Sequence, residues 1–157
     1  MSAAADLWDW AVKAFARDGV AETCLSLQDR DEQNVCLLLF GAWCAATGRP
    51  LDDEAVEAAA DVARAWDGTA VAPLRAVRRA LKAPVLDMDG PAREAVRAQV
   101  KAVELEAVRR LLADLAALAG PAGAVREALP DLVRLSRAWG GSLPRPALAR
   151  LAERLAA

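Results

Sequence analysis

The feature of the sequence that most constrains the fold is the stretch from Val35 to Ala46, which carries no charged and no strongly polar side chain. A helix that is apolar on every side is buried on every side. The stretch is too short to cross a bilayer, which takes about 20 apolar residues. A charged link, residues 29–32, precedes it, and Gly48 follows it. We therefore predict a buried central helix over about residues 34–47, with the other helices packed around it.

The remainder of the chain also has the composition of a helical protein. Ala and Leu dominate its apolar residues, the β-branched ones are mostly Val, and no alternating strand pattern of useful length occurs. A chain of 157 residues suits one domain. At this size a chain buries roughly 68–70% of its unfolded surface without a metal or a disulfide. We predict an all-α single domain, residues 1–157, folded as a compact bundle of seven or eight helices.

Hydrophobic periodicity and breaker residues divide the chain into the expected helices. Asp6 and Asn34 are the expected caps of the first and third helices, and Asp31 competes with Asn34. The segment 67–69 is expected to end the fourth helix. The seventh helix is either continuous or interrupted at Pro130. The approximate ranges are 6–17, 20–28, 34–47, 52–66, 71–82, 91–119, 124–139 and 145–156.

The expected helix of about residues 91–119 is long for a chain of this size. It contains no Gly or Pro after Pro91. It would span about 42 Å at about 1.5 Å per residue, whereas a small domain is about 30 Å across. This helix therefore bends, protrudes or packs against a second copy of the chain. Its continuous apolar stripe consists of Val96, Val100, Val103, Ala107, Leu111, Leu115 and Leu118.

The sequence lacks the side chains of the commonest catalytic and metal sites. It has no His and no Tyr, which removes Ser-His and Cys-His nucleophiles and the commonest metal ligand. Cys24, Cys36 and Cys44 lie in apolar surroundings without a CxxC spacing, so we expect reduced, buried thiols. The first residues show no signal-peptide pattern. We expect a cytoplasmic protein with no cofactor and no metal, and we favour a non-enzymatic role while an enzyme stays open.

Charge is distributed unevenly along the chain. The net charge is −2, but residues 1–70 carry −8 and residues 71–157 carry +6. This asymmetry indicates either a charged partner or two halves that face each other in the fold, and we favour the second. A pI near 5.3 and the absence of aromatic residues among the basic ones argue against nucleic acid as a partner.

Three groups of residues are candidate binding residues. The polar cluster of Gln28, Asp29 and Asn34 at the start of the central helix binds an anion or a carbonyl, or else only caps that helix. Trp8 and Trp10 lie about 200° apart on a helical wheel, so one of them is expected at an edge or a contact. The third group is basic, and it suits an acidic partner or a phosphate, or else is a solvated or paired face. It forms two helix stripes, Arg75, Arg78, Arg79 and Lys82, and Arg93, Arg97 and Lys101.

Several short motifs in residues 6–51 are characteristic when taken together. They are Leu7-Trp8-x-Trp10, Gly19-Val20, Cys24-Leu25-x-Leu27-Gln28-Asp29, Asn34-Val35, Leu37-Leu38-Leu39 and Trp43. This combination resembles the small proteobacterial family of domain of unknown function 2390, while residues 52–157 are less characteristic. The resemblance implies a bacterial, cytoplasmic protein but no activity. The family pattern has Gly where this chain has Glu32, and often Asn or Pro where it has Cys36, so neither a special turn nor a polar group at the helix start is carried over.

Three functions are consistent with these features. The first hypothesis is a non-enzymatic interaction or regulatory module that binds a protein partner through exposed Trp and charged helix faces. The second is an all-helical enzyme or small-ligand-binding protein with a pocket near Gln28 and Asp29, acting by electrostatic positioning. The third is a structural homodimer subunit formed along the stripe of residues 96–118. None of the three includes a membrane segment.

Overall fold

A computed structural model describes residues 2–157 of the chain, and it contains helices and connecting segments without any strand in that range. The predicted all-α fold is therefore confirmed. Eight α-helices are present in these residues, or seven where the continuous run of α4, η1 and α5 is taken as one. They are α1 (Ala3–Phe15), α2 (Val20–Asp29), α3 (Val35–Ala46), α4 (Asp53–Trp66), the π-helix η1 (Asp67–Val71), α5 (Ala72–Ala80), α6 (Gly90–Ala116), α7 (Leu129–Trp139) and α8 (Arg145–Ala156).

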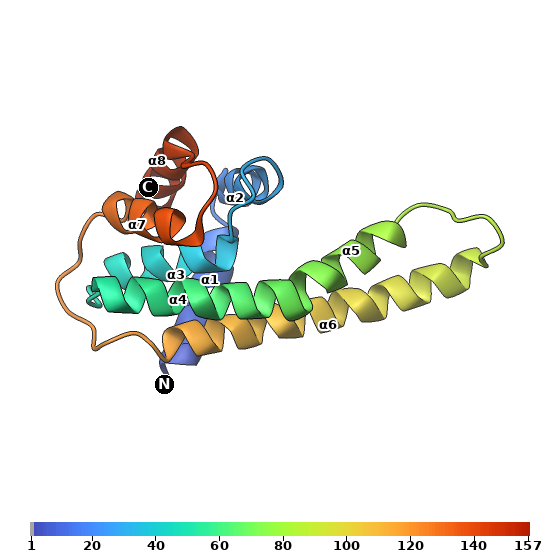
Figure 1. Ribbon diagram of the computed structural model, residues 1–157, viewed down its shortest axis with the longest axis horizontal. Coiled ribbons are helices and arrows are strands. Elements are labelled where there is room, and N and C mark those ends of the chain that lie inside the picture. Colours follow the sequence, from blue (N-terminus) through green and yellow to red (C-terminus); the bar gives the residue numbers. More distant parts are fainter. Residues whose placement is uncertain (1) are drawn as a thin grey trace.

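The predicted central helix, α3, lies inside the body of the molecule (Figure 1). Every residue from Leu37 to Ala45 is buried, and the rings of Phe40 and Trp43 lie 6.2 Å apart in the core. Gly41 permits the close approach of α7, because a Cβ at this position would lie 2.3 Å from a methyl carbon of Leu135. The apolar stretch thus supplies the surface on which α1, α2, α4, α6 and α7 pack, whereas α8 packs on α2 and α7.

The long helix α6 protrudes, which is one of the three outcomes its length allowed. Its C-terminal half packs in the body, where Ala107, Leu111 and Leu115 are buried as the stripe predicts. Its N-terminal half forms a helical hairpin with α5 that extends away from the body (Figure 1). We call this hairpin, residues 72–103, the arm. The stripe residues Val96 and Val103 lie on the arm and are half exposed, at 50% and 54%.

The segment 67–69 does not end the fourth helix as expected. The chain continues through η1 into α5, and the N–H of Ala72 donates to the carbonyl of Asp67, five residues back. A regular α-turn would place the ring of Pro73 against the carbonyl of Thr69, and the wider turn avoids that clash. One extra residue also rotates the following helix by about 100°, which changes the face that α5 presents.

The expected helix over 124–139 begins only at Leu129, with Pro130 in its first turn. The preceding segment, residues 117–128, crosses the C-terminus of α3. There the N–H groups of Gly123 and Arg126 donate to the carbonyls of Thr47 and Ala45. These carbonyls are the ones that a helix end leaves without partners. The N–H groups that donate to α3 are not used within a helix of their own, and residues 119–128 are not helical.

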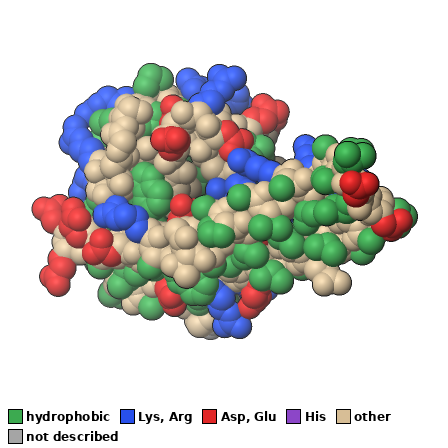
Figure 2. All heavy atoms as spheres, turned by 45° about the vertical axis from the view of Figure 1, so that its right-hand side comes forward, with side chains coloured by type: hydrophobic (Ala, Val, Ile, Leu, Met, Phe, Trp, Pro, Cys, Tyr) green, Lys and Arg blue, Asp and Glu red, His purple; other side chains and the backbone are tan. Residues whose placement is uncertain are grey.

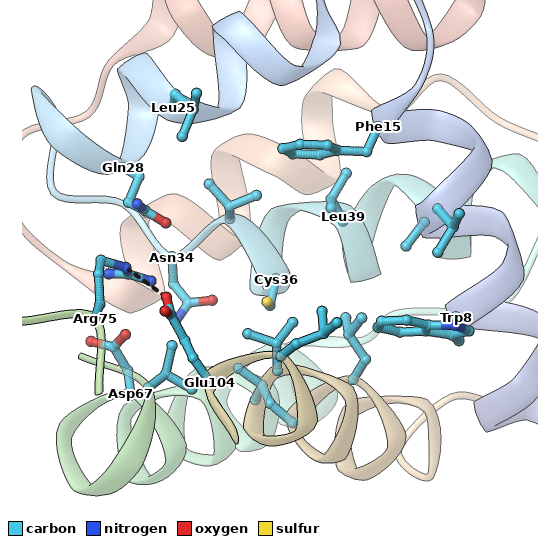
Figure 3. A pocket seen from close by; sticks show the side chains of 18 of the residues that line it. Trp8, Phe15, Leu25, Gln28, Asn34, Cys36, Leu39, Asp67, Arg75 and Glu104 are labelled. Carbon is cyan, nitrogen blue, oxygen red and sulfur yellow. Dashed lines mark ion pairs between the residues drawn. The ribbon is translucent and has the colours of Figure 1, made fainter. Parts of the chain in front are cut away.

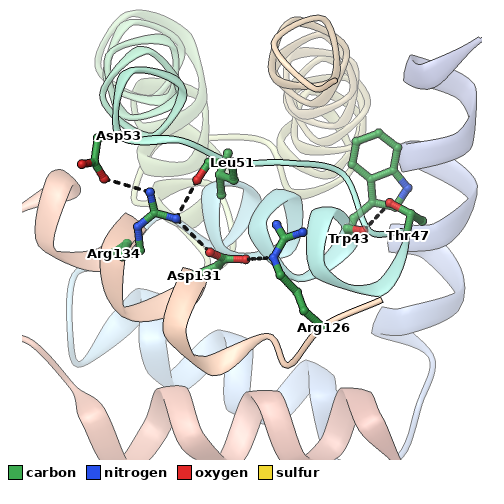
Figure 4. A network of polar contacts seen from close by, with 7 residues as sticks. All are labelled: Trp43, Thr47, Leu51, Asp53, Arg126, Asp131 and Arg134. Atoms are coloured by element: carbon green, nitrogen blue, oxygen red, sulfur yellow. Dashed lines mark hydrogen bonds and ion pairs between the residues drawn. The ribbon is translucent and has the colours of Figure 1, made fainter. Parts of the chain in front are cut away.

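The α7 helix is fastened to the link before α4 by an ion-pair network (Figure 4). The buried carboxylate of Asp131 accepts from Arg126 at 2.8 Å and from Arg134 at 3.0 Å. Arg134 also donates to the carbonyl of Leu51 and pairs with Asp53 at 2.9 Å. The hydrogen bonds to Asp53 and Asp131 raise the pKa of Arg134, so its charge is held in the folded state.

The helix starts confirm one predicted cap and correct another. Asn34 caps α3, because its Oδ1 accepts from the N–H of Leu37 at 2.9 Å. The first helix begins earlier than Asp6, since Ser2 is its cap and accepts from the N–H of Ala5. Asp6 instead lies in the first turn, where a carboxylate favours the positive end of the helix.

The link before α3 contains a special turn. Glu32 adopts a left-handed conformation with φ of 53°, which favours Gly. The family resemblance has Gly at this position, so the turn is retained here with a side chain present. The special turn that the departure from Gly put in doubt is therefore present in this chain.

Candidate functional site

A cleft of about 530 Å³ opens on the side of the body where the arm begins (Figure 3). Its walls come from α1, α2, the start of α3, η1, α5 and α6. Most of the lining is apolar, and the polar side chains gather at one end. Sites for small ligands have this size and this combination of an apolar interior with a few polar groups.

Four large apolar side chains at the cleft are unusually exposed to solvent. They are Val12 and Phe15 of α1, Leu25 of α2 and Leu105 of α6, with exposed fractions of 52%, 39%, 51% and 56%. We call these four residues the rim. Single exposed apolar residues are common on proteins, but a cluster around a cavity marks a binding surface. Leaving this area in water is unfavourable by about 25 cal/mol per Å².

The polar end of the cleft is built around the carboxylate of Glu104, which lies on the buried side of α6. Arg78 donates to both of its oxygens, from Nε at 2.5 Å and from Nη2 at 3.2 Å. Arg75 lies farther away, with its Nε 3.7 Å from Oε1 (Figure 3). The hydrogen bond to Glu104 raises the pKa of Arg78. Glu104 is thus occupied by one arginine and only loosely paired with the other.

Asp67 and Cys36 complete this end of the cleft, and burial changes the acidity of both. Burial raises the pKa of the Asp67 carboxyl, against the opposing effect of the Arg75 charge. Burial also raises the pKa of the Cys36 thiol to about 12, so this thiol is protonated and weakly nucleophilic at neutral pH. Asp67 and Val71, the two ends of η1, both line the cleft. Segments of π-helix often occur at functional sites.

The predicted polar cluster is divided by the structure. Gln28 and Asn34 line the cleft, whereas Asp29 lies outside its lining, exposed on α2. Asp29 pairs with Arg79 at 2.8 Å, and this hydrogen bond lowers the pKa of Asp29. Asn34 caps α3 through its Oδ1 and also lines the cleft.

Of the two tryptophans of α1, only Trp8 lines the cleft. The guanidinium carbon of Arg109 lies 4.8 Å from the centroid of its ring. Trp10 packs half-buried against the core. Trp43 is buried, and the other four Trp residues of the chain are half-buried, so each of these four exposes only part of its side chain. Two of them bind polar groups, since Trp66 donates to Asp114 and Trp139 donates to the carbonyl of Glu32.

The two basic stripes lie mostly within the arm. Arg93 is buried, donates to the carbonyl of Leu81 at 2.7 Å and pairs with Glu94 at 2.8 Å. Arg97 lies 3.9 Å from the same glutamate, while Lys82 and Lys101 are exposed. Arginines that bind the last carbonyls of a helix close the hairpin, because those groups have no partner within the helix.

Part of the charge asymmetry is explained by pairing between the two halves of the chain. Three arginines of residues 71–157 contact carboxylates of residues 1–70. The pairs are Arg79–Asp29, Arg134–Asp53 and Arg154–Asp18. This arrangement agrees with the interpretation that the halves face each other.

Sequence reasoning missed Glu104, Asp67 and the rim residues. Glu104 had a recognisable signal, because it lies three residues before Ala107 and seven before Leu111, on the buried stripe of α6. A carboxylate on a buried face requires a partner, and Arg78 is that partner. Asp67 and Leu105 had no comparable signal, because Asp67 looked like part of a turn and Leu105 lies off the stripe.

Within residues 2–157, no three or more His, Cys, Asp or Glu side chains are grouped so that they could hold a metal ion. In the same range, no helix combines the length and the apolar character needed to cross a membrane.

Comparison with known proteins identifies one family model, described as "Protein of unknown function (DUF2390)", which matches residues 6–115. No curated protein and no solved structure matches the chain. The lining of the cleft runs from Trp8 to Leu112, so every lining residue lies within the matched range. Both α7 and α8 lie outside it.

Proposed function

The chain belongs to the family of proteins of unknown function DUF2390, and we propose that its matched part forms a non-enzymatic binding module of the bacterial cytoplasm. The cleft holds a small amphipathic molecule, with an apolar body under the rim and a polar group at the end occupied by Arg75. Three free cysteines, each with a pKa raised to about 12 by burial, suit a reducing compartment.

The observation that carries this proposal is the rim around a largely apolar cleft of about 530 Å³. Volumes of about 300–1,000 Å³ are usual for small-ligand sites. A ligand that covers the rim removes apolar area from water, which stabilises the complex by about 25 cal/mol per Å². The polar end then orients the ligand. A ligand bound in the opposite direction would place its apolar part against Arg75 and Asp67 and leave their charges without partners.

The chemistry of the lining supports binding more than catalysis. The thiol of Cys36 is protonated at neutral pH, and the carboxylate of Glu104 is held by Arg78. A protein partner bound through exposed tryptophans has less support, because no Trp side chain is fully exposed. Trp8 contributes its ring to the cleft, and Arg79 of the basic stripe is paired with Asp29.

Titration with the neutral fluorophore Nile red tests the proposal. The wild-type protein should bind it saturably with one site, and its emission should increase in the apolar cleft. Leu105→Asn should weaken binding by about fivefold or more, because the removed side chain covers the ligand. The matched control is Leu86→Asn, since Leu86 is 90% exposed at the tip of the arm and lies outside the cleft. Equal affinity of the two variants would contradict the proposal.

A second candidate function is self-association through the arm. Val96 and Val103 are half exposed there, and hydrophobic side chains gather along the arm (Figure 2). Two copies that pack these faces together would bury the stripe as in a coiled coil. Sedimentation equilibrium at micromolar concentration tests this candidate, and Val96→Lys with Val103→Lys should dissociate a dimer. A monomer for the unaltered chain would overturn it.

A further inference from the structure

Two charged side chains at the polar end of the cleft, Arg75 and Asp67, have no hydrogen-bond partner within residues 2–157. Within residues 2–157 the guanidinium of Arg75 makes no hydrogen bond and has only its long ion pair with Glu104, 3.7 Å from Nε to Oε1. The carboxylate of Asp67 takes part in no hydrogen bond and no ion pair within the same residues. Both side chains line the cleft and lie close to Glu104 in Figure 3.

The other charged and amide side chains at this end each have at least one hydrogen-bond partner. Arg78 donates to both oxygens of Glu104, and Asn34 accepts from the N–H of Leu37. Gln28 donates to Asp29 at 3.4 Å. Arg75 and Asp67 are therefore the charged groups that remain available to a ligand.

The charges at this end are balanced when all of its groups are ionised. Arg75 and Arg78 supply two positive charges, and Glu104 and Asp67 supply two negative ones. A ligand anion would approach Asp67 as a like charge, and a ligand cation would approach the two arginines. A neutral group that both donates and accepts satisfies Asp67 and Arg75 without disturbing this balance.

We propose that the ligand is a neutral fatty primary amide, whose N–H donates to Asp67 and whose carbonyl oxygen accepts from Arg75. Its hydrocarbon chain lies under the rim. This inference rests on the proposed function of the cleft and names the chemical class of its ligand. A primary amide suits the site because its carbonyl oxygen and one of its N–H groups lie on the same side of a planar group. They can therefore bind two neighbouring side chains, whereas the N–H and the carbonyl of a trans secondary amide point in opposite directions.

Calorimetric titration with two matched amides tests the inference near neutral pH. Dodecanamide carries the N–H groups, and N,N-dimethyldodecanamide keeps the carbonyl but lacks the donor. Wild-type protein should bind the first about tenfold more tightly, which is the effect of leaving a charged acceptor without its donor. Asp67→Ala should bind both amides alike, because the acceptor is absent. Asp61→Ala, on the exposed face of α4, is the control and should keep the wild-type preference.

A second pair of variants addresses the carbonyl. Arg75→Met should weaken both amides by about the same factor, whereas Arg79→Met should leave both affinities unchanged, because Arg79 lies outside the cleft. Thermal unfolding of every variant verifies that it is folded before its affinity is compared.

The outcomes separate this inference from the proposed function. Equal wild-type affinity for the two amides would overturn the amide assignment and leave an apolar binding cleft. Tighter binding of dodecanoate than of dodecanamide would overturn it in favour of an anion site. If neither amide nor Nile red binds, both the inference and the proposed function are wrong.

Discussion

Glu104 of α6 accepts two hydrogen bonds from a single guanidinium, that of Arg78 on α5, at 2.5 Å and 3.2 Å. This pair joins the two helices of the arm at the point where they leave the body. It also places the charged end of the cleft at the base of the arm. The stability of the arm and the shape of the cleft therefore depend on the same contact.

Glu104→Met should destabilise the fold by about 1–3 kcal/mol in urea unfolding. Removing one partner of a buried pair costs about 3–5 kcal/mol, and the partial exposure of Arg78 reduces this figure. The double variant Glu104→Met with Arg78→Met should recover part of the loss, because no charge is left unpaired. The control is Glu106→Met, which breaks only the exposed pair with Arg110. Equal losses for the two single glutamate variants would refute this expectation.

Gly48→Ala should destabilise the protein by about 2 kcal/mol or more, measured by thermal or urea unfolding. Gly48 has φ of 67°, and a Cβ there would lie 2.1 Å from the carbonyl carbon of Gly123. The matched substitution Gly68→Ala meets no atom within 4 Å and lies in η1. It should stabilise by about 0.5–1 kcal/mol, because Ala favours helix over Gly. A harmless Gly48→Ala would show that the segment 117–128 does not pack against α3 as described.

Glu32→Gly should stabilise the protein by up to about 1 kcal/mol. The left-handed conformation of Glu32 costs a residue with a side chain about 1–2 kcal/mol, and the greater freedom of Gly in the unfolded chain offsets part of that gain. The carbonyl of residue 32 still accepts from Trp139, so no contact is lost. Urea unfolding gives the sign, and a loss of stability would indicate that the Glu32 side chain itself stabilises the link.

Asp67→Asn should raise stability near neutral pH, and this gain should disappear below about pH 4. Burial raises the pKa of Asp67 above the ordinary value of 3.8, so the folded chain holds this proton more tightly than the unfolded chain. The stability that protonated Asp67 contributes is fully present below the pKa of the unfolded chain, and it is lost as the pH rises through the pKa of the folded chain. Asn is neutral at every pH in this range, so the variant keeps this stability as the pH rises.

The difference in unfolding free energy between wild type and Asp67→Asn, followed against pH, is the measurement for this prediction. A variant less stable than wild type at neutral pH would mean that the charge of Asp67 is stabilised in the fold. It would also mean that the carboxylate already has the partner that the proposed ligand is expected to supply.

Local patterns predicted the helices best where each helix has its own start signal and an apolar face. The cap of α3 at Asn34 and the buried run from Leu37 to Ala45 followed from such patterns. The helix predictions fail where contacts with a segment far away in the chain determine the local structure. Residues 124–128 were expected to be helical, but they are not, and Arg126 among them donates to the carbonyl of Ala45 near the end of α3.

The cleft could be predicted only in part. Trp8, Gln28, Asn34, Arg75 and Arg78 were all among the candidate residues, and the structure brings them to one cavity. Their meeting place could not be derived from spacing, because they come from four helices and their positions depend on packing. The π-turn of η1 adds a rotation of about 100° to α5 that helical periodicity does not include.

The sequence by itself determined an all-helical chain with a buried central helix, since both follow from short-range propensity and from apolar residues on every side of one stretch. It also determined that α6 is too long for the body. Tertiary structure decided that α6 protrudes, that Glu104 binds Arg78, and that Arg75 and Asp67 remain available in the cleft. These outcomes depend on contacts between residues far apart in the chain, which no local pattern records.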